Sequence, residues 1–146
     1  MDYNCSPFFI YMKYSNYIGI FCSAAIVATC FLPWVHISSL NVTLSGVNGK
    51  VSDNLSFGTQ LIAHTVFAVT MGILFLVPKV GAKRANILIG AIQLSWAIKN
   101  FTVFTMCREG ECPEKLAGMY ILVFFSVTLL IMSLFPAIKE KGIGLG

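Results

Sequence analysis

Polar side chains at helical spacing interrupt two long apolar stretches of the sequence. Gln60 and His64 are four residues apart in one stretch. Trp96 and Asn100 have the same spacing in another, with Lys99 beside them. Residues four apart share one face of a helix, and an ionisable residue in a membrane-spanning helix is by default a candidate for function. We therefore predict a polar cluster that could bind a cofactor or ligand, formed by Gln60, His64, Trp96, Lys99 and Asn100.

Purely structural roles compete with this hypothesis, and we favour them. Gln60 and His64 can hydrogen-bond neighbouring helices, as polar side chains commonly do in membrane bundles. Lys99 lies near the end of its apolar stretch, so its amine can reach the lipid headgroups while its stem follows the helix. The sequence contains no Ser-His-Asp arrangement, paired-acid site or Gly-rich phosphate motif, so we expect no catalytic residue and no enzyme.

Cys107 and Cys112 are the second candidate for chemistry. Four residues separate them, and Gly110 between them allows a tight bend. In an oxidising compartment such a pair forms a disulfide. Redox-active pairs usually have the closer Cys-x-x-Cys spacing and a site that stabilises a thiolate, which Glu109 and Glu111 disfavour. We predict a structural disulfide, with a redox pair as the alternative, and expect no metal site because no Cys/His cluster has ligand spacing.

The composition indicates a chain that lies in an apolar environment such as a lipid bilayer. Hydrophobic residues make up 57% of the sequence and charged residues only 11%, against about 25% charged in soluble domains. Lys and Arg fall into short segments and form no basic patch, which argues against nucleic-acid binding. We predict one all-α integral membrane domain over residues 1–146, a four-transmembrane-helix bundle with about 20 residues in each span. The spans are expected at about residues 17–35, 58–77, 85–105 and 116–138.

The connecting segments predict an orientation. Positively charged residues are enriched in cytoplasmic loops of membrane proteins. One set of loops and termini holds six Lys and Arg residues and the other holds three, so both termini should be cytoplasmic. The six are Lys13, Lys79, Lys83, Arg84, Lys139 and Lys141, and the three are Lys50, Arg108 and Lys115.

The loop between the first two spans predicts a small β-hairpin on the outer side. Apolar residues alternate with polar ones from Leu40 to Leu44, and Asn48-Gly49 is a strong signal for a two-residue type I′ turn. Val51 and Leu55 would lie on the returning strand. A lone hairpin needs support, so we expect it to cap the helix ends, with a docking surface for a partner as the alternative.

Two families share parts of this layout. A four-span chain with a hairpin after the first span resembles claudin-like proteins, and an outer Cys-x4-Cys resembles the disulfide-forming quinone reductases of bacterial inner membranes. The first outer loop here has no cysteine pair and no Trp-Gly-Leu-Trp run, so no residue role is transferred. The general layout resembles small four-span bacterial proteins. We therefore expect the protein to be located in the bacterial inner (plasma) membrane.

These observations favour a non-enzymatic accessory or assembly subunit of a larger membrane complex, with no cofactor. Its partners would be the lipid bilayer and other membrane subunits or further copies of itself. Small residues at Gly19, Ser23, Gly72 and Gly90 would allow close helix approach. One alternative is a membrane thiol/quinone redox protein that uses Cys107 and Cys112 with His64 and Lys99. Another is a small oligomeric channel or carrier.

Overall fold

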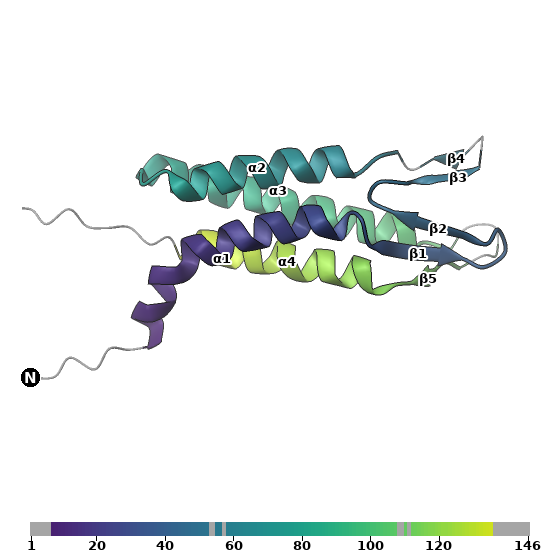
Figure 1. The fold of residues 1–146 in the computed structure, drawn as a ribbon, viewed down its shortest axis with the longest axis horizontal. Helices are drawn as coiled ribbons and strands as arrows, with labels where there is room; N and C mark the ends of the chain where they lie inside the picture. The colour runs from purple at the N-terminus through teal and green to yellow at the C-terminus, as the bar shows by residue number, and fades with distance from the viewer. Residues whose placement is uncertain (1–6, 53–54, 57, 108–109, 111, 136–146) are drawn as a thin grey trace, which may run out of the picture.

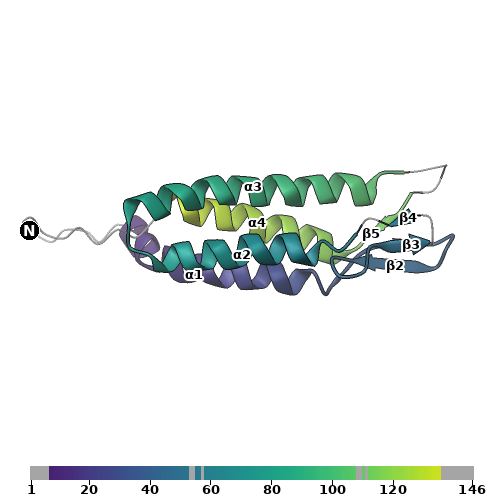
Figure 2. The same cartoon turned by 90° about the horizontal axis from the view of Figure 1, so that it is seen from above.

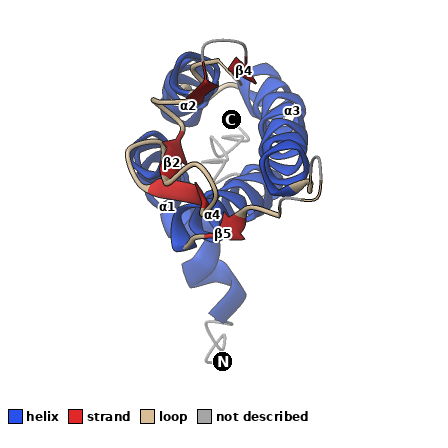
Figure 3. Cartoon of the chain, turned by 90° about the vertical axis from the view of Figure 1, so that its right-hand side faces the viewer, coloured by secondary structure: helices blue, strands red, loops and turns tan. Residues whose placement is uncertain are grey.

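The computed structural model describes residues 7–52, 55–56, 58–107, 110 and 112–135. Within these residues four helices run along the long axis and short strands gather at one end (Figure 1). Helices α1 and α3 each pack against both α2 and α4, so the bundle forms a ring when viewed along its axis (Figure 3). The prediction of a mainly helical chain is confirmed. The helices are α1 (Pro7–Thr29), α2 (Leu61–Leu76), α3 (Val80–Thr105) and α4 (Ala117–Leu134).

The first helix ends earlier than the sequence predicts. The amides of residues 30–32 each donate to the carbonyl three residues before, at 3.1 Å, which tightens the chain after Thr29. Pro33 then begins an extended strand, because proline lacks an N–H and disfavours a helical residue before it. The expected span over residues 17–35 is therefore wrong at its end. Trp34 is buried there, and its Nε1 donates to the carbonyl of Thr29 at 2.8 Å.

Helices α2 and α3 are joined by only three residues, Val77 to Lys79. Pro78 explains the break, since a proline cannot continue the hydrogen bonding of α2. Helix α3 begins at Val80, five residues before the predicted start of the third span. Lys83 and Arg84 consequently belong to a helix and not to a loop, which corrects the position given to them from the sequence.

A small sheet extends the bundle at the end opposite the α2–α3 connection (Figure 2). Its strand order is β2-β1-β5, and both pairings are antiparallel. A second antiparallel pair joins β3 and β4. The amide of Leu116 also donates to the carbonyl of Trp34 at 2.9 Å, which ties the start of α4 to β1. The strands are β1 (Pro33–Ile37), β2 (Val42–Ser45), β3 (Lys50–Ser52), β4 (Leu55–Ser56) and β5 (Glu114–Lys115).

The first loop does contain a hairpin, but its position differs from the prediction. β2 pairs with β1, and the turn between them uses Asn41, whose φ is +50°. Asparagine is one of the few residues that tolerate this conformation. The predicted type I′ turn at Asn48-Gly49 was wrong, because that turn needs positive φ at both positions and Asn48 does not have it. Instead Ser45 donates its amide to the carbonyl of Asn48 at 3.0 Å.

Two of the helices, α3 and α4, are long and apolar enough to cross a membrane. Among the described residues, this finding weakly suggests an association with membranes. The apolar helices Tyr14–Thr29 and Leu61–Leu76 are shorter. At about 1.5 Å per residue, the 16 residues of α2 extend about 24 Å, against about 30 Å of hydrocarbon in a bilayer.

Candidate functional site

His64 lies at the centre of a hydrogen-bonded network inside the bundle. The side chain is fully buried in the first turn of α2. Nδ2 of Asn100 lies 3.1 Å from Nε2 of His64, and Nδ1 of His64 lies 3.3 Å from Oε1 and 2.9 Å from Nε2 of the Gln93 amide. A neutral imidazole has one donor and one acceptor nitrogen. Asn100 can therefore donate to Nε2 while Nδ1–H donates to Gln93, and both ring nitrogens are satisfied by α3.

The network continues from α3 to α4. Nε2 of Gln93 donates to Oγ of Ser126 at 3.4 Å, and the hydroxyl of Ser126 donates to the carbonyl of Leu122 at 2.8 Å. Gln93 and Ser126 are fully buried, as is His64. These hydrogen bonds thus connect Asn100, His64 and Gln93 with Ser126 on α4. We name this set (Asn100, His64, Gln93 and Ser126) the central network.

The spacing of residues on α3 explains why His64 has two partners there. Gln93 and Asn100 are seven residues apart, which is about two helical turns, so both amides face the bundle interior. Asn86 repeats the interval. The sequence-based cluster omitted Gln93, although this seven-residue repeat of amide side chains was a visible signal for it.

Gln60 and Trp96 form a second bridge between α2 and α3. Nε1 of Trp96 donates to Oε1 of Gln60 at 3.2 Å. Lys99 does not enter the interior, since its side chain is exposed and its Nζ lies 4.4 Å from the centroid of the Trp96 ring. Four of the five predicted residues therefore join α2 to α3 in two hydrogen-bonded groups. Lys99 instead makes a cation–π contact with Trp96 on the surface.

A second buried polar group lies near the α2–α3 connection, where the sequence predicted none. Lys83 is only 4% exposed, and its Nζ donates to Oδ1 of Asn16 at 2.9 Å and to the carbonyl of Phe75 at 3.0 Å. Ser15 donates to the carbonyl of Met132 at 2.8 Å and ties α1 to α4. Lys83 thus fixes the start of α3 against α1 and the end of α2.

Asn86 has a different environment. Its side chain is 1% exposed, and neither Oδ1 nor Nδ2 has a hydrogen-bond partner among the described residues. Leaving a buried polar group unsatisfied costs about 1–3 kcal/mol. Asn86 therefore contributes less to stability than Gln93 and Asn100, which occupy equivalent positions of the same repeat.

The four cysteines within the described residues form an exposed pair and a buried pair, and Cys5 lies outside those residues. Cys107 and Cys112 are joined by a disulfide, as predicted, and both are exposed. The bond closes the segment between the end of α3 and β5. Cys22 and Cys30 are free and buried within the apolar core. Among the described residues, no group of three or more His, Cys, Asp and Glu side chains could hold a metal ion.

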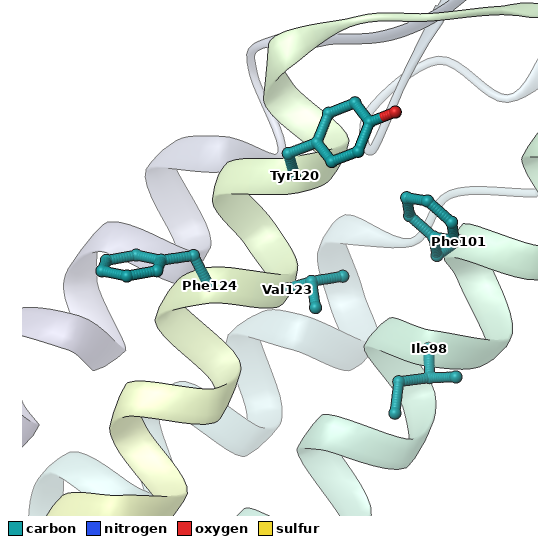
Figure 4. Close-up of a pocket in the computed structure, with 5 residues that line it drawn as sticks. All are labelled: Ile98, Phe101, Tyr120, Val123 and Phe124. Atoms are coloured by element: carbon teal, nitrogen blue, oxygen red, sulfur yellow. The ribbon is translucent and has the colours of Figure 1, made fainter.

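An apolar groove lies on the outer surface between α3 and α4 (Figure 4). Its volume is about 340 Å³. The rings of Phe101 and Tyr120 meet edge to face across it, with their centroids 5.7 Å apart. The groove is separate from the central network, whose side chains are buried. Its lining residues are Ile98, Phe101, Tyr120, Val123 and Phe124.

No known protein family, curated protein or solved structure matches this chain.

Proposed function

We propose that the chain is an integral membrane protein in which all four helices cross the bilayer as one bundle. The observation that carries this proposal is the distribution of polarity across the helices. Their outward faces are mainly apolar, with exceptions that include Ser95, Lys99 and Thr102 on α3, whereas the interior holds His64, Gln93, Asn100 and Lys83. A soluble bundle has the opposite arrangement, with polar residues outside. Outward-facing residues include Tyr17 and Phe21 on α1, Ile62, Val66 and Ile73 on α2, Leu88 and Ile92 on α3, and Phe124 and Ile131 on α4.

The shorter helices are compatible with this arrangement. A helix shorter than the hydrocarbon thickness is accommodated by local thinning of the bilayer and by flanking residues, at a modest cost. Helix α2 is followed by Val77, and the turn after α1 contains Phe31 and Leu32, which are exposed and apolar. These residues extend the apolar surface beyond the helix ends.

The orientation we propose places the α2–α3 connection in the cytoplasm and the sheet outside. Lys79 and Arg84 are exposed near that connection. The count of six Lys and Arg residues against three supports the same orientation. An oxidising outer side also suits the exposed Cys107–Cys112 disulfide. A bacterial inner membrane is the compartment we propose.

Within that membrane we propose a non-enzymatic role as an accessory or assembly subunit of a larger complex. The central network supports this role because its polar groups are used to join helices of the bundle to one another. Side chains that hydrogen-bond one another in this way stabilise the fold. The outward faces of the helices and the sheet are then the surfaces left for interaction with other subunits.

Site-specific photocrosslinking in native membranes tests this role. A photoreactive amino acid would replace one outward residue on each helix, at Phe21, Val69, Leu88 and Ile131. We expect an adduct of defined mass with one other membrane protein from one or two adjacent helices. The buried residue Leu122 is the control and should give no intermolecular adduct. Absence of protein adducts from all four outward positions would overturn the accessory role.

The exposure of the disulfide supports a second candidate function, in thiol–disulfide exchange. In that reaction the Cys107–Cys112 bond would take two electrons and two protons from a partner dithiol, which becomes a disulfide. Acid quenching followed by alkylation measures the oxidised fraction in cells. A redox protein should show both forms, whereas a structural disulfide should be fully oxidised. His64 and Lys99 give no support to this candidate, since one is buried and the other is on the surface.

A further inference from the structure

The groove between α3 and α4 has the surface properties of a lipid site. All of its lining side chains are aromatic or aliphatic, and Tyr120 supplies the only side-chain hydroxyl among them. Phe124 is 65% exposed and Ile98 is 50% exposed, so the groove opens outward. Its volume of about 340 Å³ lies at the small end of the range for ligand pockets. The groove can therefore hold a slender apolar group.

A cation lies over one of the aromatic rings that line this groove. Nζ of Lys115 is 5.8 Å from the centroid of the Phe101 ring, and the ring of Tyr120 meets the same phenylalanine. Lys115 makes no ion pair with any residue in the described part of the chain. The carboxylate of its neighbour Glu114 contacts Ser38 instead, and its Oε1 accepts a hydrogen bond from the Ser38 hydroxyl at 3.3 Å. The apolar groove thus borders a positive charge with which no described residue forms an ion pair.

The lining argues against a transmembrane helix as the occupant. Helices that associate in membranes approach closely through Gly, Ala, Ser and Thr. The groove has none of these residues and is bordered by Phe101, Tyr120 and Phe124. Large side chains hold a second helix backbone at a distance, whereas a flexible acyl chain can lie between them.

We propose that this groove binds an anionic phospholipid, with one acyl chain between α3 and α4 and the phosphate beside Lys115 and the hydroxyl of Tyr120. The inference rests on the proposed membrane-spanning function, because it requires the groove to face lipid. The ammonium group would form a charge-assisted hydrogen bond to a phosphate oxygen. Basic pockets between membrane helices recognise anionic headgroups in the same way. The aromatic rings would contact the acyl chain.

Electron paramagnetic resonance of spin-labelled lipids tests this proposal. The full chain would be reconstituted in phosphatidylcholine bilayers with a trace of spin-labelled phosphatidylglycerol or spin-labelled phosphatidylcholine. The measured quantity is the fraction of motionally restricted label. We expect phosphatidylglycerol to be preferred by about threefold to fivefold, the effect of one interfacial lysine on an anionic lipid, with a decrease at high salt.

Lys99 provides a matched control for Lys115. Both amines lie over an aromatic ring, but the ring below Lys115 is Phe101, which lines the groove, whereas Lys99 lies over Trp96, which does not line it. Lys115→Gln should abolish most of the preference, whereas Lys99→Gln and Lys115→Arg should retain it. Val123→Trp would fill the groove and should reduce the preference while leaving Lys115 in place. Circular dichroism of each variant establishes that the helices are intact.

Three results would overturn the lipid site. Wild-type protein could show equal restriction of the two lipids, or Lys115→Gln could leave the preference unchanged. Equal losses in Lys115→Gln and Lys99→Gln would assign the preference to general surface charge. If neither label is restricted at all, the chain does not present its helices to lipid, and the proposed membrane-spanning function fails together with the site.

Discussion

Asn100 donates a hydrogen bond to His64 across 3.1 Å, although the two residues are 36 positions apart in the chain. Gln93 holds the other ring nitrogen of His64. A single imidazole is therefore fixed at two levels of α3, about 10 Å apart along the helix axis. The ring of Trp34 covers it edge-on, with ring centroids 6.1 Å apart. His64 thus fixes the position of α2 along α3 as well as the spacing between the helices.

The first prediction concerns coupling within the central network. His64→Leu and Gln93→Leu should each lower the free energy of unfolding, because each leaves a buried partner unsatisfied, at about 1–3 kcal/mol. The double variant should lose less than the sum, with a coupling above about 0.5 kcal/mol. Unfolding in mixed detergent micelles measures these values. Lys99→Leu is the control, and it should be nearly neutral and additive with His64→Leu.

A comparison of two asparagines on α3 provides the second prediction. Asn86→Leu should leave stability unchanged or raise it by up to about 1 kcal/mol, because the native amide has no partner among the described residues. Asn100→Leu should lower stability by about 1–3 kcal/mol, since it removes a partner of His64. Equal losses in the two variants would contradict this difference and would show that Asn86 has a hydrogen-bond partner such as internal water.

The third prediction concerns the disulfide. Replacing both Cys107 and Cys112 by Ser should destabilise the protein by about 2 kcal/mol, because the bond restricts the unfolded chain. Thermal unfolding in detergent measures the loss. A reductant should lower the melting temperature of the wild type and have no effect on the double variant. Two free thiols in protein purified without reductant would rule out the bond.

The fourth prediction tests the orientation through single-cysteine labelling in a background without native cysteines. An impermeant maleimide should label Asn48→Cys in intact cells, because this exposed residue lies at the end proposed to be outside. Lys79→Cys should label only after the cells are opened. Lys79 is suitable because it is exposed, whereas Lys83 is buried and would react poorly on either side. The reverse pattern would invert the topology.

Apolar windows in the sequence were sufficient to find the four helices, because hydrophobicity over about 20 residues is a strong signal. They could not reveal β1, since a short strand inside an apolar stretch has the same hydrophobicity as a helix. The Cys107–Cys112 disulfide followed from spacing. The buried position of Lys83 depends on Asn16 and Phe75, which only the packed bundle brings together. Gln93 could have been found from its seven-residue interval to Asn100.

The pairing of β1 with β5 has a consequence for biosynthesis. β1 follows the first helix, whereas β5 is made about 80 residues later and directly precedes the last helix. During translation β1 can pair with β2 at once, but its other edge stays open until β5 emerges. An open edge strand is a template for wrong pairing with other chains. Nascent chains that stall before α4 should therefore be the forms most prone to aggregate and most dependent on chaperones.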